Sequence, residues 1–427
     1  MKIIYIHQYF NTPTMKGGVR SYDIALHLAS LGHEVHMITS WRDQSKAKDW
    51  FCSNENGINV HWYPIEYSNH LSYRSRISVF LKFAWNAYSY SKKLNMDIIF
   101  ATSTPLTVAI PAILISRKKS IPMVFEVRDL WPDVAIAVGA LTNPITKFIA
   151  KKLEKMAYRK SEAIIALSDG MKQGIKKAGY PDERIAVITN FSNNSLFNVR
   201  SSHVSSSFRK SREWLNSKPL LVYTGAFGLI NGLTYLIDLA EQLQLIGSDV
   251  KILLVGDGRD YERLIEYAKD KGVLDQNLFI ESQIQKSELP SLLSAADLAC
   301  NIVIENSAVW DNSANKFFDA LASGTPVLVN DQGWQAKLIQ QTLSGIASFG
   351  IPMNELAFLI HKQLHDEEWK FLAGKNAKYL AQEYFDKNKL VDMVENIINE
   401  SSKYRGFNAS KIGINKLNDL DKNETIF

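Results

Sequence analysis

Short β-rich runs alternate with helix-length segments along most of this 427-residue chain. The runs IIYIHQYF, EVHMIT, DIIFAT, PMVFEV and AIIALS are almost continuously apolar, which is typical of parallel strands buried on both faces of a sheet. Segments long enough for helices, such as residues 19–31 and 143–160, stand between them. This alternation predicts an α/β fold with a doubly wound parallel sheet.

The same pattern begins again after a serine-rich stretch, SSHVSSSFRKSRE at residues 201–213, which is typical of a linker. The new β-rich runs are PLLVYTG, VKILLVG, NLFIE, LACNIV and PVLVN. We therefore expect two Rossmann-like domains, at residues 1–200 and 214–385. The carboxyl ends of both sets of strands should face a shared cleft, where ligands of open α/β sheets bind.

Residues 386–427 are expected to form a C-terminal helix and a polar tail. A long helical pattern covers residues 367–400, and Asp386 is a candidate break within it. The tail from residue 401 has few apolar anchors, so we expect it to be poorly ordered.

Composition argues against several classes of protein. The two cysteines, Cys52 and Cys300, are far apart and indicate free thiols in a reducing compartment. The net charge of +5 comes without a dense basic run, which argues against nucleic acid as a partner. No uncharged apolar window reaches the ~18 residues of a membrane span, and the start MKIIYIHQYF does not resemble a secretory signal.

Motifs for metal, serine or P-loop chemistry are also missing from the sequence. The nine histidines are scattered, and no cluster of His, Cys and Asp has metal-ligand spacing. One DLD string lies in the polar tail, and neither a G-x-S-x-G elbow nor a Walker lysine motif occurs. We expect chemistry that needs neither a cofactor nor a metal ion.

The segment DNSANKFFDALASGTPV at residues 311–327 combines charge with apolar bulk. Ser313 is predicted to cap a helix that ends at Gly324, with Pro326 beyond it. Lys316 and Asp319 then share one helix face, about 4.5 Å apart along the axis at ~1.5 Å per residue.

This arrangement suits a nucleotide. A helix start and Lys316 would attract a diphosphate, and Asp319 would accept hydrogen bonds from a ribose diol. Asp311, in the loop before the helix, would reach hydroxyls of a sugar beyond the phosphates. The alternative is an ordinary capped helix with a surface ion pair between Lys316 and Asp319.

The segment resembles the acidic–x7–acidic motif of the retaining GT-B glycosyltransferases of family 4, with Asp311 and Asp319 in the two acidic positions. Glutamate is usual at both. The fuller pattern DNS…NKFFDALASGTPVLVN is similar to the branch of bacterial O-antigen N-acetyl-L-fucosamine transferases of the WbuB type. The resemblance extends to about residue 400. It implies a GT-B fold with an N-terminal acceptor domain and a C-terminal nucleotide-sugar donor domain.

In the first half, the resemblance implies two further contact regions. Gly17 and Gly18 follow the first strand and would lie against the donor diphosphate, and Arg20 is a candidate phosphate contact. The string RDLWP resembles a signature of the same branch. There Arg128, where many relatives have histidine, would contact a phosphate, and Asp129 would orient the reacting hydroxyl. The alternatives are a solvated Arg20 and a structural pair of Arg128 with Asp129.

In the second half, glycine turns at strand ends would let the backbone approach the donor. Most relatives carry an Arg and a Lys in the loop YTGAFGLINGL, whereas this chain has neither. The negative charge of the diphosphate would then be compensated by Lys316, by helix starts and by Arg128 or Arg20. The expected donor contacts in this half, besides Lys316, are Gly225, Gly228, Asn231, Asp257, Gln283, Ser313, Asn315 and Asp319.

The resemblance implies a retaining hexosyltransferase. It would move N-acetyl-L-fucosamine, or a similar 6-deoxy-HexNAc, from UDP to an undecaprenyl-diphosphate-linked saccharide in O-antigen or capsule biosynthesis. Stabilising the departing diphosphate should lower the barrier most. The resemblance implies front-face departure, with a donor phosphate oxygen taking the acceptor proton. The expected catalytic residues are Arg128, Asp129, Asp311 and Lys316.

Residues 72–94 form a basic amphipathic helix pattern, with five basic residues and no acidic one. The helix would either pack on its own domain or face an anionic membrane surface. The second interpretation predicts a cytoplasmic enzyme, peripheral on the inner face of the plasma membrane. The apolar positions of the pattern are Ile77, Phe80, Leu81, Ala84, Trp85 and Tyr88.

Two other functions stay open at this point. A UDP-sugar 2-epimerase would share the two-domain architecture but should carry more acid–base carboxylates in the cleft. A non-catalytic nucleotide-binding partner would explain the missing Arg and Lys of the second-domain loop.

Overall fold

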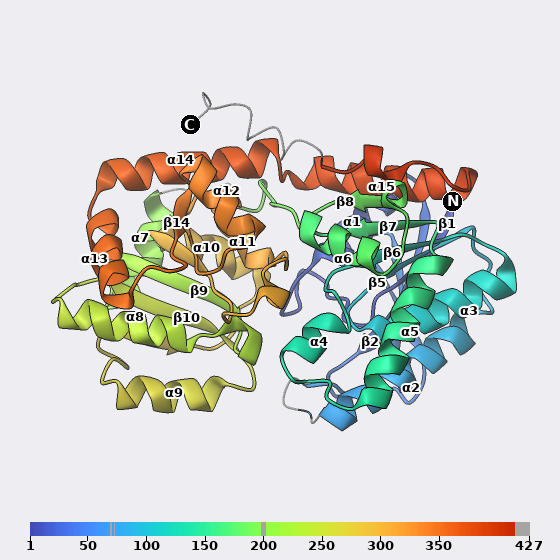
Figure 1. Cartoon of the computed structure of the whole chain (residues 1–427), viewed down its shortest axis with the longest axis horizontal. Coiled ribbons are helices and arrows are strands. Elements are labelled where there is room, and N and C mark those ends of the chain that lie inside the picture. The colour runs from blue at the N-terminus through green and yellow to red at the C-terminus, as the bar shows by residue number, and fades with distance from the viewer. Residues whose placement is uncertain (69–70, 72, 198–201, 415–427) are drawn as a thin grey trace.

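The computed structural model describes residues 1–427 except 69–70, 72, 198–201 and 415–427. Two α/β domains lie side by side, and each has a sheet between helical layers (Figure 1). The expected doubly wound fold is confirmed. Among the helices of the described residues, none is long and apolar enough to cross a membrane.

The N-terminal sheet has the strand order β3-β4-β2-β1-β5-β6-β7-β8. Every pair is parallel except β3 with β4, an antiparallel edge pair that the sequence pattern did not reveal. Continuously buried runs form the central strands, as expected for a sheet covered on both faces. The strands are β1 (Lys2–Ile6), β2 (Glu34–Trp41), β3 (Phe51–Glu55), β4 (Ile58–Pro64), β5 (Ile98–Thr102), β6 (Met123–Val127), β7 (Ala163–Ala166) and β8 (Ile185–Val187).

Helices cover both faces of this sheet. One core contains residues of α1 and α15, and the other contains residues of α2, α3, α5 and α6 (Figure 1). The short helix α4 (Asp133–Ala137) follows β6. Asn143 caps α5, whose start and end match the prediction. The covering helices are α1 (Arg20–Ser30), α2 (Tyr73–Ser91), α3 (Ala109–Lys119), α5 (Pro144–Lys160), α6 (Asp169–Lys177) and α15 (Lys387–Lys403).

The C-terminal sheet is parallel, with the order β11-β10-β9-β12-β13-β14. Its strands are β9 (Leu220–Ala226), β10 (Lys251–Asp257), β11 (Leu278–Glu281), β12 (Leu298–Asn301), β13 (Val327–Val329) and β14 (Gly345–Ala347). The helices are α7 (Ser202–Lys210), α8 (Thr234–Leu245), α9 (Tyr261–Asp270), α10 (Leu289–Ala295), α11 (Asn315–Ser323), α12 (Trp334–Thr342), α13 (Met353–Leu364) and α14 (Glu367–Glu383).

The chain crosses between the domains twice, and the two crossings are hydrogen-bonded to each other. Ser192 donates its N–H to the Phe385 carbonyl at 2.7 Å and accepts from the Lys387 N–H at 3.0 Å. Asp386 caps α15, so the predicted break is confirmed. Beyond it, α15 returns to the N-terminal domain and buries Leu390 and Val394 in its core (Figure 1).

Two expectations about polar segments are corrected. The serine-rich stretch is not a bare linker, because α7 forms there and Arg209 bonds to Asp297 at 2.8 Å. The start of the tail is ordered, because Ala409 and Ile414 pack on the N-terminal core. In the first case the high serine content suggested a linker although the segment is helical. In the second case the apolar residues that anchor the tail are too widely spaced to form a visible pattern. Residues 415–427 lie outside the described residues.

Candidate functional site between the domains

A cavity of about 1030 Å³ lies between the two domains, and we call it the interdomain cavity. The N-terminal domain lines it with the loop after β1, including Gly17 and Gly18. The C-terminal domain lines it with Asn315, Lys316 and Asp319 from α11. The loop and the helix start that the sequence singled out thus lie in one cavity, although 297 positions separate Gly18 from Asn315.

Helix α11 forms because its apolar face is buried and its end is favourable. Phe317 and Phe318 are fully buried, and Gly324 takes the left-handed conformation, φ 67°, that the prediction required. The predicted cap is wrong: Ala314 occupies that position, and the Ser313 hydroxyl accepts from the Asn190 N–H at 3.3 Å instead. The start of α11 therefore has no side-chain cap facing the cavity.

Lys316 is a half-buried cation whose ammonium has only neutral partners. Its Nζ donates to the Tyr223 hydroxyl at 2.8 Å and to Asn231 Oδ1 at 3.3 Å, and lies 4.0 Å from the centre of the Tyr223 ring. Burial lowers the pKa of Lys316 to about 7, and the Cys300 thiol opposes that shift only in part. Among the described residues, no carboxylate forms an ion pair with Lys316. An anion in the cavity would supply the missing charge.

Asp319 does not pair with Lys316, so the surface ion pair considered above is not formed. Its carboxylate instead contacts Lys286 Nζ, and both side chains are largely buried. Lys286 begins the short 3₁₀ turn η4 (Lys286–Glu288), which Gln285 and Glu288 close as a capping box. Lys286 was not predicted as a site residue, and Gln285 in place of the usual Ser or Thr makes the capping box hard to recognise from the sequence.

The glycine loop lies directly against α11. A Cβ atom at Gly18 would lie 2.6 Å from Asn315 Nδ2, and one at Gly17, where φ is +116°, would lie 2.7 Å from Asn11 Nδ2. Asn11 also donates to the Gly18 carbonyl at 3.1 Å. Gly17 therefore needs glycine for its positive φ, and Gly18 lets the loop approach Asn315 of the other domain closely.

The expectation that Arg20 contacts a phosphate is contradicted. Arg20 is buried, and its guanidinium bonds to Glu126 Oε1 at 2.8 and 3.0 Å and to the Thr189 carbonyl at 2.7 Å. Burial alone would raise the pKa of Glu126, but the charges of Arg20 and Arg128 hold it below its ordinary value. Arg20 is thus a structural cation whose charge is already compensated.

Arg128 and Asp129 do not form a salt bridge within the described residues. Arg128 Nη1 lies 3.3 Å from His7 Nε2, and Thr104 donates its hydroxyl to Asp129 at 3.1 Å. Burial raises the pKa of the Asp129 carboxyl. Burial and the charge of Arg128 lower the pKa of His7 well below its usual value, so the His7 imidazole is neutral. His7 was missed, although it directly follows β1 at the edge where ligands bind.

Asp311 lies at a contact between the domains rather than in the lining of the interdomain cavity. Its backbone carbonyl accepts from the Ser168 hydroxyl at 2.7 Å, and its carboxylate lies over Gly170, where a Cβ atom would be 1.8 Å from Oδ1. Burial raises the pKa of Asp311. The contact with a donor sugar stays a prediction for this residue.

The other expected donor contacts separate into two sets. Gly225, Asp257 and Gln283 line the cavity, whereas Gly228 lies outside its lining. Gly225 has φ +143° and lies close to Lys316, because a Cβ atom there would be 3.2 Å from Nζ. Asn231 acts through the Lys316 bond already described.

Three cations that were not predicted as site residues line the interdomain cavity. Besides Lys286, the cavity is lined by Lys16 and Arg42 from the N-terminal domain. Arg42 contacts Asn11 through a hydrogen bond and lies over the Tyr9 ring. Lys16 directly precedes the predicted Gly17 and Gly18, whereas Arg42 and Lys286 come from loops that no motif marked.

The expectation that no His, Cys and Asp cluster has metal spacing is wrong. Asp249, His361 and His365 come together in the C-terminal domain, with their ligand atoms within 4.8 Å of one another. The spacing His-x3-His was visible in the sequence, whereas its carboxylate partner lies more than a hundred positions away.

Comparisons with known proteins agree with this architecture. Residues 17–194 match the model of Glycosyltransferase Family 4, and residues 205–400 match that of Glycosyl transferases group 1. The chain is 23% identical to alpha-D-kanosaminyltransferase of Streptomyces kanamyceticus, over 67% of this chain and 72% of the relative. It is 21% identical to N-acetyl-alpha-D-glucosaminyl L-malate synthase of Bacillus anthracis, over 90% of this chain and 94% of the relative.

Among solved structures, Anabaena Alr3699/HepE in complex with UDP-glucose is similar, with a TM-score of 0.69 and 18% identity over 94% of this chain and all of that one. This likeness bears out the GT-B fold, with two Rossmann-like sheets. Together the two family models cover most of the sequence, one on each domain. The chain belongs to the family 4 glycosyltransferases.

Proposed function

We propose that the protein is a retaining glycosyltransferase that uses a UDP-sugar and acts on a lipid-linked saccharide. The donor would carry an N-acetylated amino sugar, with N-acetyl-L-fucosamine or a similar 6-deoxy-HexNAc as the specific expectation. Two relatives whose names denote kanosaminyl and N-acetylglucosaminyl transfer support an amino sugar. The Anabaena complex with UDP-glucose supports the nucleotide.

The observation that carries this proposal is the environment of Lys316. An ammonium that is partly withdrawn from water among neutral partners is costly, and an anionic ligand would reduce that cost. The uncapped start of α11 faces the same cavity and favours negative charge. A nucleoside diphosphate combines the charge with a ribose that could bond to Asp319.

In the proposed reaction, the acceptor oxygen bonds to the anomeric carbon as the bond from that carbon to the diphosphate oxygen breaks. The hydroxyl proton passes to a donor phosphate oxygen, and UDP leaves. Lys316 and the α11 start would stabilise the developing charge, the role that a metal ion plays in other transferases. Asp129 would orient the acceptor hydroxyl, and Arg128 would contact a phosphate.

The outer face of the N-terminal domain supports a lipid-linked acceptor. On α5, Ile145 and Phe148 are each 69% exposed, and Lys152 and Lys155 are exposed on the same helix. An exposed apolar group beside lysines suits an anionic membrane surface. This face was not predicted, since the sequence analysis assigned a membrane surface only to residues 72–94.

Helix α2 contributes differently from the prediction. Its buried face centres on Phe83, Ala84 and Ala87, while Leu81 and Trp85 are exposed. Helix α3 packs against both α2 and α5, so the three helices form one layer (Figure 1). We propose that this layer docks the enzyme on the cytoplasmic face of the plasma membrane.

A thermal-shift panel tests the donor. UDP and one UDP-HexNAc should raise the melting temperature, whereas GDP, ADP and their sugars should not, because selective ligands of the native state stabilise it. Activity should persist in EDTA. A shift with every nucleotide, or with none, would contradict the assignment of the donor.

Flotation with anionic liposomes tests the membrane surface. Lys152→Glu with Lys155→Glu should reduce binding severalfold at low salt, since each basic residue contributes about 1 kcal/mol near such a surface. Lys269→Glu with Lys375→Glu, which reverses exposed charges on the C-terminal domain, is the matched control. Equal losses in both double variants would show general charge attraction and remove the proposed surface. Both variants should retain the thermal shift with UDP.

A further inference from the structure

Helix α13 presents two histidines one turn apart at its carboxyl end. His361 lies in the last turn of α13 and His365 is its C-cap, so the i, i+4 spacing places them on one face. Their ring centres are 4.4 Å apart. Cations are also favoured near a helix carboxyl end. This is a general arrangement for chelating a divalent ion with two imidazoles.

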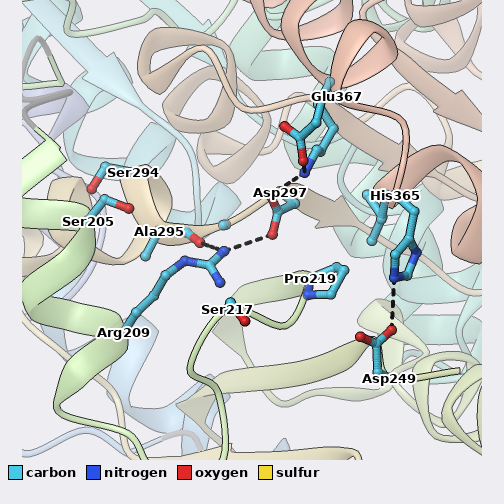
Figure 2. Close-up of a pocket in the computed structure, with 13 residues that line it drawn as sticks. Ser205, Arg209, Ser217, Pro219, Asp249, Ser294, Ala295, Asp297, His365 and Glu367 are labelled. Carbon is cyan, nitrogen blue, oxygen red and sulfur yellow. Dashed lines mark hydrogen bonds and ion pairs between the residues drawn. The ribbon is translucent and has the colours of Figure 1, made fainter.

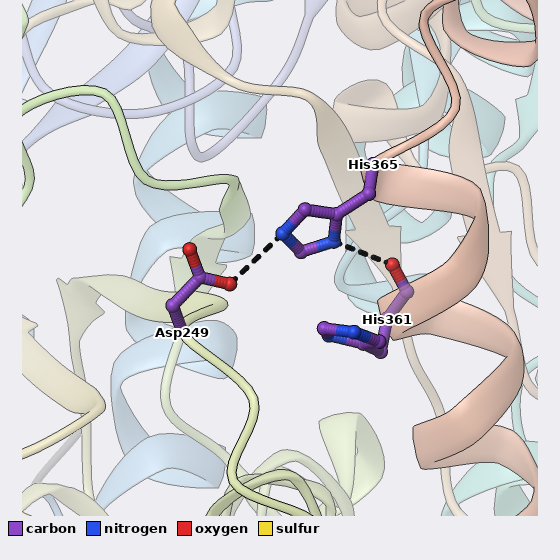
Figure 3. A group of neighbouring side chains, drawn as sticks. All are labelled: Asp249, His361 and His365. Atoms are coloured by element: carbon purple, nitrogen blue, oxygen red, sulfur yellow. Dashed lines mark hydrogen bonds and ion pairs between the residues drawn. The ribbon is translucent and has the colours of Figure 1, made fainter.

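A carboxylate faces this pair from another element. Asp249 precedes β10, and its Oδ1 lies 3.0 Å from His365 Nε2 (Figure 3). One ligand atom from each of the three residues lies within 4.8 Å of the others. Small side-chain rotations would bring all three to the ~2.0–2.2 Å bonds of a zinc ion.

The outer hydrogen bonds orient both rings as in metal-binding histidines. His365 donates from Nδ1 to the His361 carbonyl at 2.7 Å, which leaves the lone pair of Nε2 facing Asp249 (Figure 3). His361 Nδ1 contacts the Ser248 hydroxyl at 2.9 Å. Histidine ligands commonly bond to a carbonyl or similar group through the second nitrogen. Between Nε2 and the carboxylate, either a proton or a metal ion must mediate the contact.

Two cations of the adjoining cavity are paired with carboxylates other than Asp249. Asp249 and His365 border a polar cavity of about 640 Å³ that is open to solvent beside the cluster (Figure 2). There, Arg209 and Lys370 are engaged by Asp297 at 2.8 and 3.5 Å, and Lys370 also bonds to Glu367. Water from this cavity could complete the coordination sphere.

We propose that Asp249, His361 and His365 form a binding site for a divalent transition-metal ion of the zinc class. Two imidazoles and one carboxylate favour zinc, nickel or cobalt over magnesium or calcium, which prefer oxygen ligands. The ion would tie α13 to the start of β10. Because Asp257, at the other end of β10, lines the interdomain cavity, the metal site is separate from the proposed donor site.

Zinc titration of untagged protein tests the site. A Cys52→Ser background removes an exposed thiol that contacts His61, a second possible zinc ligand. We expect one equivalent of zinc bound, no magnesium bound, and a higher melting temperature with zinc. His361→Gln and Asp249→Asn should each weaken this binding about tenfold or more. The thermal shift with UDP should be unchanged in both.

His27→Gln is the matched control, because His27 pairs with Asp392 at 2.8 Å and belongs to no three-residue metal-ligand group within the described residues. It should bind zinc as the parent does. The proposal is overturned if the parent binds no zinc, or if His361→Gln and Asp249→Asn bind it with parental affinity. The parent titration decides the first point even if a variant fails to fold.

Discussion

Arg20 is a buried cation and Lys316 a half-buried one, each at the carboxyl edge of a parallel sheet, and both were expected to meet a phosphate. The surroundings of Arg20 compensate its charge fully, with Glu126 and backbone carbonyls within hydrogen-bond distance. Those of Lys316 offer a phenol, an amide oxygen and an aromatic ring. The comparison teaches that the counter-charge distinguishes a structural cation from one prepared for a ligand.

The largest expected effect concerns stability at Arg20. Arg20→Met leaves Glu126 buried without its partner, and breaking such a pair typically costs about 3–5 kcal/mol in the free energy of unfolding. Chemical denaturation measures this cost, and adding Glu126→Gln should recover much of it. If Arg20→Met keeps parental stability but binds UDP-sugar poorly, Arg20 would be a ligand-binding cation rather than a structural one, and the comparison would fail.

At Lys316 we expect the opposite pair of effects, a loss of ligand affinity and a gain in stability. Lys316→Met should weaken UDP-sugar binding about 10–150-fold, from ~1.5–3 kcal/mol for a lost charge-assisted hydrogen bond. The ligand-free variant should nevertheless be more stable than the parent, because an uncompensated buried charge is gone. Calorimetry and thermal melts measure the two effects.

The pH dependence of that stability gain sharpens the comparison. The folded-state pKa of Lys316, about 7, lies below the ordinary lysine value of 10.5. Burial of the charge is therefore fully unfavourable below pH 7, and the penalty fades between pH 7 and 10.5. The advantage of Lys316→Met in unfolding free energy should be greatest at low pH. A pH-independent difference would contradict this assignment.

The smallest expected effect comes from Gly225, whose backbone lies beside the Lys316 ammonium. Gly225→Ala would place a Cβ atom 3.2 Å from Nζ and should weaken UDP-sugar binding severalfold. Gly247→Ala is the matched control, since Gly247 also has positive φ, +70°, but nothing lies near its added Cβ. Both variants should lose stability through backbone strain, and only Gly225→Ala should lose affinity.

The sequence revealed the features that depend on neighbouring residues. Alternating apolar runs predicted the two sheets, and Gly324 and Asn143 marked a helix end and a helix start that the structure confirms. The family resemblance placed the glycine loop with Gly18 against the same diphosphate as Lys316, and both residues line the interdomain cavity. Hydrophobic periodicity and helix capping depend on residues a few positions apart, so they can be recognised from one sequence alone.

The features that sequence reasoning missed depend on distant pairs. Arg20 meets Glu126 across 106 positions, and Lys286 meets Asp319 across 33, so no local pattern shows which cation is compensated. The return of α15 to the N-terminal domain and the approach of Asp249 to His365 have the same cause. Tertiary packing decides these partners, and the sequence supplies only the candidates.

The most direct test measures the pKa of Lys316 itself. NMR titration of isotope-labelled lysine, with Lys316→Arg used to assign the signal, should give a pKa near 7 in the free protein. Saturating UDP-sugar should raise that pKa well above its free value, because the diphosphate supplies the missing negative charge. A pKa near 10 in the free protein, or one that UDP-sugar leaves unchanged, would contradict the account.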